Sequence, residues 1–281
     1  MSKRSRALVA TAASLACTAA LALTPVASGA SSLPTLDVAL NGTHGISVSG
    51  SMVSGAVNVV STFSGHAPSG PNTNGPEYGL VRLNPGVSFQ QAFDAVQGHH
   101  GDINALTPYG TLFVDASAPG TIQTVLTPGN YAALNITGNG PPAVTQFTVS
   151  QSSSPAALPK AKATETAIEF TFRGAKVLHD GTIVRARDGG WLVHMITLIG
   201  VRNKATGKAV MALLREGKDH GAEKLVNHRF VNLMGPASPG AIQQMVLHAK
   251  SGYYVEACFM DTLDGREHTQ LGMERLVRIA K

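Results

Sequence analysis

The feature that most constrains the fold of this chain is an internal repeat. Ala118–Gln123 (APGTIQ) precedes Gly129–Leu134, and Ser238–Gln243 (SPGAIQ) precedes Gly252–Ala257 in the same order. The offset between the two copies is about 120 residues. A unit of this length that is present twice favours tandem domains over a solenoid. A third pair of segments, Glu77–Leu83 and Met195–Val201, aligns in the same way.

Both copies have the pattern of short strands separated by turn residues. Charged residues make up only 14% of the chain while there are 30 glycines, a balance typical of β-sheet with many turns. Each copy also contains one helical segment, Phe89–Val96 behind a capping Ser88 and Ala205–Glu216 at the equivalent place. We expect an all-β protein of two tandem Greek-key β-sandwiches, each with a short helical insertion. The expected strands are 56–63, 78–83, 123–126, 131–136, 168–173, 181–187, 191–201, 242–247 and 252–259.

The first thirty residues have the pattern of an export signal. A basic start precedes the apolar run Ala7–Leu23, Pro25 breaks it, and Ser28–Ala30 supplies the small residues that a signal peptidase needs. The run is short for a membrane span. The sequence therefore predicts a signal peptide at 1–30 with cleavage near Ala30, a secreted protein and no membrane span.

The remaining chain is long enough for two cores. Serines, prolines and alanines make 151–163 a linker between a first domain at 31–150 and a second at 164–281. The signal carries three basic residues and no acidic one, so its removal lowers the net charge from +5 to +2. A charge this small gives no reason to expect a nucleic-acid partner. The sequence leaves the oligomeric state open.

Cleavage near Ala30 also removes Cys17 and leaves Cys258 as the only cysteine of the mature chain. Exported proteins usually pair their cysteines or avoid them, because a single thiol is open to oxidation. A lone thiol in such a protein is buried and inert, reactive, or bound to a metal.

Three other candidate ligands indicate that the Cys258 thiol is bound to a metal. His268 and Met273 follow Cys258 within sixteen residues, and His194 lies earlier in an apolar, strand-like run. A thiolate, two imidazoles and a thioether are the ligands of a mononuclear copper electron-transfer site. The sequence predicts that His194, Cys258, His268 and Met273 bind one copper ion.

In its second half the sequence resembles the cupredoxins, the family of plastocyanin, azurin and pseudoazurin. The likeness is carried by Asp180–Val184, the strand around His194, Gly252–Cys258, and a His268-x₄-Met273 motif before an apolar strand. It implies Cys258 as the thiolate ligand, His194 and His268 as equatorial ligands and Met273 as the axial one. It also implies a redox partner protein and a role in electron transfer or copper holding. No acid–base pair or nucleophile motif suggests an enzyme.

Two features depart from the family pattern. Nine residues separate Cys258 from His268, more than blue-copper proteins usually have. Strand alternation also places Glu256 on the same face as Cys258, where it must pair, become neutral, bind the metal or escape through a bulge. Glu256 is therefore a candidate either for contacting the metal ligands or for binding the metal itself, which leaves open a zinc or red-copper type of centre.

The first repeat lacks every ligand. Pro76 stands at the position of His194, Asn135 at that of Cys258, and a short Gly138–Pro142 replaces the loop that carries His268. We expect no metal in this degenerate copy. The same observation keeps open an alternative for the whole chain, a non-metal β-sandwich that serves as a binding or cell-wall-associated module.

Overall fold

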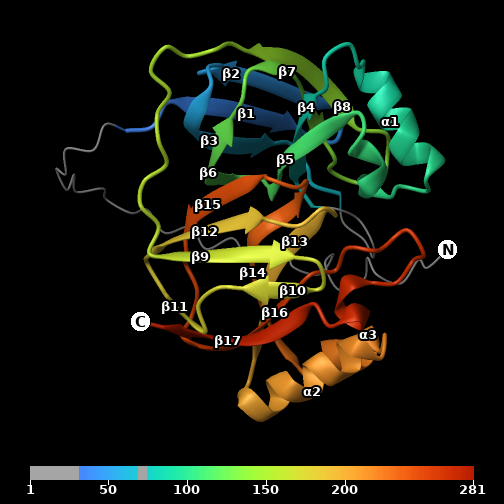
Figure 1. Cartoon of the computed structure of the whole chain (residues 1–281), viewed down its shortest axis with the longest axis vertical. Coiled ribbons are helices and arrows are strands. Elements are labelled where there is room, and N and C mark those ends of the chain that lie inside the picture. Colours follow the sequence, from blue (N-terminus) through green and yellow to red (C-terminus); the bar gives the residue numbers. More distant parts are fainter. Residues whose placement is uncertain (1–31, 69–74) are drawn as a thin grey trace.

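The computed structural model describes residues 32–68 and 75–281, which form two β-sandwiches stacked along the long axis of the molecule (Figure 1). We call residues 32–150 the N half and residues 163–281 the C half. The predicted signal peptide lies outside the described residues. Within the described ranges, no helix is both long and apolar enough to cross a membrane.

The strands and helices follow in a regular order along the chain. The N half contains β1 (Thr35–Asn41), β2 (Gly45–Gly50), β3 (Gly55–Ser64), β4 (Glu77–Leu83), α1 (Phe89–Gly98), η1 (Ile103–Leu106), β5 (Gly110–Ser117), β6 (Gly120–Leu126), β7 (Gly129–Asn135) and β8 (Ala143–Val149). The C half contains β9 (Ala163–Ile168), β10 (Thr171–Arg173), β11 (Val177–His179), β12 (Ile183–Asp188), β13 (His194–Val201), α2 (Lys204–Arg215), α3 (Asp219–Glu223), β14 (Val226–Ala237), β15 (Ile242–Val246), β16 (Gly252–Ala257), η2 (His268–Leu271) and β17 (Glu274–Ala280).

One eight-stranded sheet runs through both halves, in the order β10-β9-β12-β15-β6-β3-β1-β2. Its two ends are equivalent, because β1 runs parallel to β3 and β9 runs parallel to β12. The halves join where β6 pairs antiparallel with its counterpart β15, through Thr124 with Gln243 and Gln123 with Gln244. The repeat found in the sequence is thus visible as a repeated strand order about this central pair.

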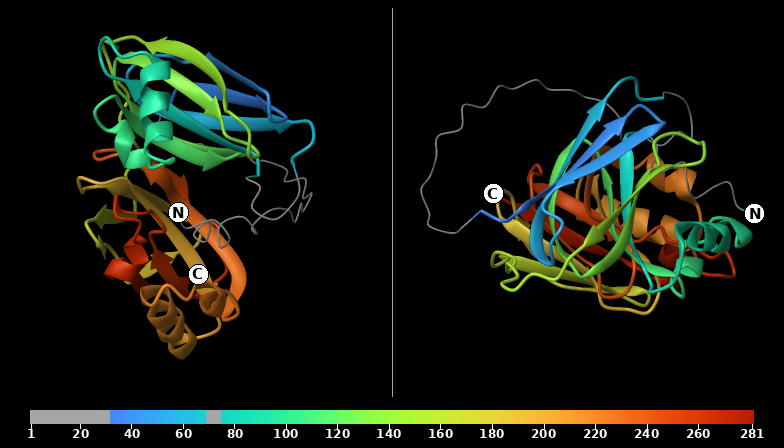
Figure 2. Two further views of the ribbon diagram at one scale, coloured as in Figure 1. Left: turned by 90° about the vertical axis from the view of Figure 1, so that its right-hand side faces the viewer. Right: turned by 90° about the horizontal axis from the view of Figure 1, so that it is seen from above.

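Each half of the long sheet is covered by a second sheet. The order is β5-β4-β7-β8 in the N half and β11-β17-β16-β13-β14 in the C half. Figure 2 shows the two layers of each half from the side and from above. Their inner faces enclose separate cores, one around Leu80 and Tyr131 and the other around Ile196 and Val255. All eight residues of β13 are buried, which explains its continuous apolar sequence. The all-β fold of two sandwiches with helical insertions is confirmed.

The two predicted helices form almost where expected. Ser88 caps α1 with a complete capping box that includes Gln91, and the Asn203 side chain caps α2 by accepting a hydrogen bond from the Thr206 amide. One predicted strand is wrong. Residues 168–173 are not a single strand, because Glu169 and Phe170 form a tight turn between β9 and β10. The residues of this turn contact the candidate site.

Residues 151–162 contain neither helix nor strand, and Ala163, the last residue of the predicted linker, begins β9. The exact domain boundaries stay a prediction. The long sheet adds something that the sequence did not indicate, because it joins the two sandwiches by backbone hydrogen bonds as well as by the linker.

Candidate metal centre

The candidate ligands lie at the ends of neighbouring elements in the C half. His194 is the first residue of β13, and Cys258 directly follows the last residue of β16. His268 opens the short helix η2, and Met273 lies between η2 and β17. Because β13, β16 and β17 are adjacent in one sheet, these ends meet at the same pole of the sandwich.

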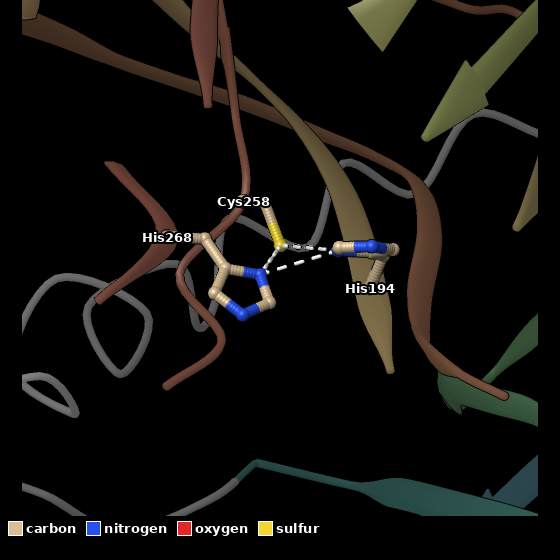
Figure 3. Close-up of side chains that lie close together, drawn as sticks. All are labelled: His194, Cys258 and His268. Atoms are coloured by element: carbon tan, nitrogen blue, oxygen red, sulfur yellow. Dashed lines mark hydrogen bonds between the residues drawn. The ribbon is translucent and has the colours of Figure 1, made fainter. Parts of the chain in front are cut away.

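Three of the four predicted ligands converge on one point (Figure 3). The Nδ1 atoms of His194 and His268 are 3.2 Å apart, and the Cys258 sulfur lies 3.8 Å and 3.3 Å from them respectively. All three side chains are completely buried. Among the described residues, they are the one cluster of at least three His, Cys, Asp or Glu donors close enough to share an ion.

The size of this triangle fits a metal ion. An ion with bonds of about 2.0–2.1 Å to imidazole nitrogen and about 2.3 Å to thiolate sulfur separates its donor atoms by about 3.4–3.8 Å. The three measured separations span 3.2–3.8 Å, so little movement is needed for the donors to share an ion. One thiolate with two imidazoles is also a donor set that suits copper.

The long loop between Cys258 and His268 reaches the site because most of it folds into a hairpin of its own. Asp261 and Glu267 form an isolated antiparallel bridge, and the Thr262 amide donates to the Arg266 carbonyl at 2.8 Å. The chain returns beside its starting point, where the His268 amide donates to the Met260 carbonyl at 2.8 Å. The nine residues therefore do not leave His268 loosely held.

Met273 is held next to the cluster by its backbone. Its carbonyl accepts a hydrogen bond from the Cys258 amide at 3.2 Å, and its amide donates to the His268 carbonyl at 3.0 Å. The preceding Gly272 has a φ of 94°, a left-handed conformation that favours glycine and turns the chain into β17. The Met273 side chain is fully buried in the same core cluster as Cys258. Its role as an axial ligand stays a prediction.

Burial determines the protonation of the three donors. It raises the pKa of the Cys258 thiol to about 12 and lowers the pKa of the His194 imidazole. Burial, together with the neighbouring His194, lowers the pKa of His268 to about 4. At neutral pH the metal-free site thus holds a neutral thiol and two neutral imidazoles. The imidazoles are ready to bind a cation, whereas the thiol must first release its proton.

The buried Glu256 carboxylate forms an ion pair with Arg275, which is one of the outcomes expected from the sequence. Arg275 on the adjacent β17 donates to Glu256 and also to Glu165 of β9. Both glutamates are completely buried. Burial and the charge of Glu256 raise the pKa of Glu165 to about 8, and the Arg275 guanidinium acts in the opposite direction. Glu256 is not among the donors that converge with the cysteine and the two histidines.

The ligand-free N half borders the site directly. The Asn104 side chain of η1 accepts a hydrogen bond from the Val193 amide at 2.8 Å and donates to the Asp261 carbonyl at 3.3 Å. It thereby connects the segment that enters β13 with the loop that follows Cys258. Beside it, a pocket of about 580 Å³ lies between α1 and the exposed side chains of Trp191 and Leu263.

Sequence reasoning missed the residues that surround the two imidazoles. The ring of Phe170 packs edge-on against His268 with centroids 5.2 Å apart, and a Glu169 oxygen lies 3.5 Å from Nε2 of His194. The turn that carries them has no Gly, Pro or Asn to mark it. Asn104 gave no signal either, since it belongs to the other half of the chain.

No protein-family model and no curated protein matches this sequence. Among solved structures, a reduced auracyanin from Roseiflexus castenholzii shares 13% identity over 42% of this chain and 95% of its own, with a TM-score of 0.27. Auracyanin A, a "blue" copper protein from Chloroflexus aurantiacus, shares 13% identity over 42% of this chain and 99% of its own, with a TM-score of 0.23. A copper-containing nitrite reductase from Thermus scotoductus shares 11% identity over 88% of this chain and 61% of its own, with a TM-score of 0.24.

Proposed function

We propose that this protein is a secreted, cupredoxin-like protein that binds one copper ion in its C half. His194, Cys258 and His268 are its equatorial ligands and Met273 is its weak axial ligand. The observation that carries the proposal is the buried triangle of one sulfur and two Nδ1 atoms, 3.2–3.8 Å on a side. The apolar segment at 7–23 supports export of the chain.

The role that best suits such a site is transfer of single electrons or storage of copper. When bound, copper supplies a one-electron redox couple, and the protein supplies the geometry around it. The rigid frame of β13, β16 and η2 holds the same donors for both oxidation states. Complete burial of the three donors keeps bulk water out. The expected partner is a redox protein, and we propose no catalytic activity.

One experiment distinguishes the copper-binding proposal from the alternative of a non-metal β-sandwich module. Purified mature protein, residues 31–281, is mixed with copper(II), its visible spectrum is recorded, and its metal content is measured after dialysis. We expect an intense thiolate-to-copper absorption and one retained copper ion per chain. His99→Ala, at an exposed histidine of the N half, is the matched control and should change neither result. Absence of both the absorption and the retained copper would favour the non-metal module.

A further inference from the structure

The two-residue turn between β9 and β10 contacts both imidazoles of the candidate site. Ile168 and Thr171 pair across the turn, and only Glu169 and Phe170 lie between them. Phe170 has a φ of 54°, a left-handed conformation that is costly for a bulky side chain. In this conformation its ring packs against His268, while the neighbouring Glu169 reaches His194.

The Glu169 carboxylate is held in place by the segment that leads into β13. One of its oxygens, Oε1, accepts hydrogen bonds from the backbone amides of Trp191 and Leu192. The same oxygen lies 3.5 Å from Nε2 of His194. The carboxylate is thus tied to the backbone two residues before the ligand, and its side chain is only 12% exposed.

The space between Glu169 and His194 depends on a glycine. A Cβ atom at Gly190 would lie 2.2 Å from Oε1 of Glu169 and 2.9 Å from Nε2 of His194, closer than real Cβ contacts allow. Any other residue at Gly190 would push the carboxylate away from the imidazole. Nε2 of His194 is buried and has no hydrogen-bond partner within the described residues, and the Glu169 oxygen 3.5 Å away can accept its proton.

The carboxylate selects one protonation form of the neutral imidazole. A proton on Nε2 faces Glu169, and Nδ1 then presents its lone pair towards His268 and Cys258. This is the tautomer that a ligand bound through Nδ1 requires. Carboxylate partners of metal-binding histidines fix the ring and increase its basicity, and their removal typically weakens metal affinity by about 10- to 100-fold.

We propose that Glu169 is a positioning residue that holds His194 in its Nε2–H tautomer and orients Nδ1 towards the metal. The inference rests on the proposed copper site but predicts a property of the metal-free protein as well. In the copper form, the negative charge of Glu169 stabilises the more positive oxidised state. Loss of this charge therefore raises the reduction potential.

Glu169→Gln tests the proposal, because the amide oxygen can still accept from Trp191 and Leu192 while the charge is lost. The first measurement is ¹⁵N NMR of the imidazoles in the metal-free full chain. We expect His194 to be the Nε2–H tautomer in the wild type and to have a larger Nδ1–H fraction in Glu169→Gln, because a neutral amide oxygen in the place of Oε1 is a weaker acceptor for the Nε2 proton. Glu223→Gln, at a surface glutamate of α3, is the matched control. An Nδ1–H tautomer at His194 of the wild type would overturn the proposal without any variant.

The second measurement is copper affinity and reduction potential of the same three proteins. Glu169→Gln should bind copper about 10- to 100-fold more weakly and have a higher potential, with Glu223→Gln unchanged. Unaltered affinity and potential in a copper-loaded Glu169→Gln protein would refute the inference while leaving the copper site intact. If the wild type binds no copper, the proposed function fails, and the tautomer of His194 still decides the role of Glu169.

Discussion

The two halves share a strand order, yet they use the equivalent pole of the sandwich differently. In the C half, Cys258 at the end of β16 contributes a sulfur to the buried triangle. Asn135, at the end of β7, takes the equivalent place in the N half. It pairs with Tyr78 of β4, and in this register Pro76 takes the position of His194. The Asn135 amide donates to the carbonyls of Gly42 and Gly45 and accepts from the Thr137 amide.

Polar side chains therefore occupy the equivalent pole in both halves. The N half fills this pole with one amide side chain and three backbone groups, whereas the C half brings three buried donor atoms together there. The scaffold around the pole is kept in both halves. The ligand-free half nevertheless contributes to the other site, because Asn104 connects Val193 with Asp261.

Cys258→Ser should give the largest effect, because it removes the sulfur atom that distinguishes the pole of the C half from that of the N half. A serine hydroxyl replaces the thiolate, so the donor set that suits copper is lost. We expect no thiolate-to-copper absorption and no copper retained through dialysis, measured by visible spectroscopy and metal analysis. Because the two side chains are similar in size, circular dichroism should still show the native fold. Full copper retention by this variant would contradict the assigned thiolate ligand.

Arg275→Met tests the second difference between the halves, the buried Glu256 that replaces Ala133 of the N half. The substitution leaves Glu256 and Glu165 buried without their cation. Removing one partner of a buried ion pair costs about 3–5 kcal/mol, so we expect a loss of this size in the free energy of unfolding by denaturant. Adding Glu256→Ala should recover part of the loss. Arg266→Met, at an exposed ion pair, is the control.

Asn135→Ala tests the polar connection of the N half. It leaves the amide of buried Thr137 and the carbonyls of half-buried Gly42 and Gly45 without their partner, and one unsatisfied buried group costs about 1–3 kcal/mol. We expect the free energy of unfolding to fall by about 2–3 kcal/mol, while the copper absorption and affinity of the C half stay unchanged. A variant that keeps full stability would show that the amide does not hold the pole together.

Copper affinity should change continuously with pH, and this effect should be smaller than those of the substitutions. Burial raises the pKa of the Cys258 thiol to about 12, so below that pH the thiol is protonated and must release a proton to bind the ion. Copper affinity should therefore rise with pH by about tenfold, or about 1.4 kcal/mol, per pH unit around neutrality. Calorimetry in buffers of different ionisation enthalpy should detect about one released proton. An affinity independent of pH would argue against a thiolate ligand.

Much of the fold and site followed from local sequence patterns. The repeat, the alternating strands and the order of His194, Cys258 and His268 are properties of short segments, and the structure brings these three residues together. The turn at Glu169 and Phe170 was missed because Phe170 adopts a left-handed conformation that its residue type does not indicate. The pairing of β6 with β15 was also missed, since it depends on how the halves meet in space.

The hairpin that carries the chain from Cys258 to His268 has a practical consequence for protein engineering. Its base is fixed by the bridge between Asp261 and Glu267, while Asp264 and Gly265 at its tip are exposed. Extra residues inserted between these two would lengthen the tip and leave the base in place. This tip is therefore a suitable attachment point for a short tether, which would fix the protein to an electrode through the loop that leads directly to His268.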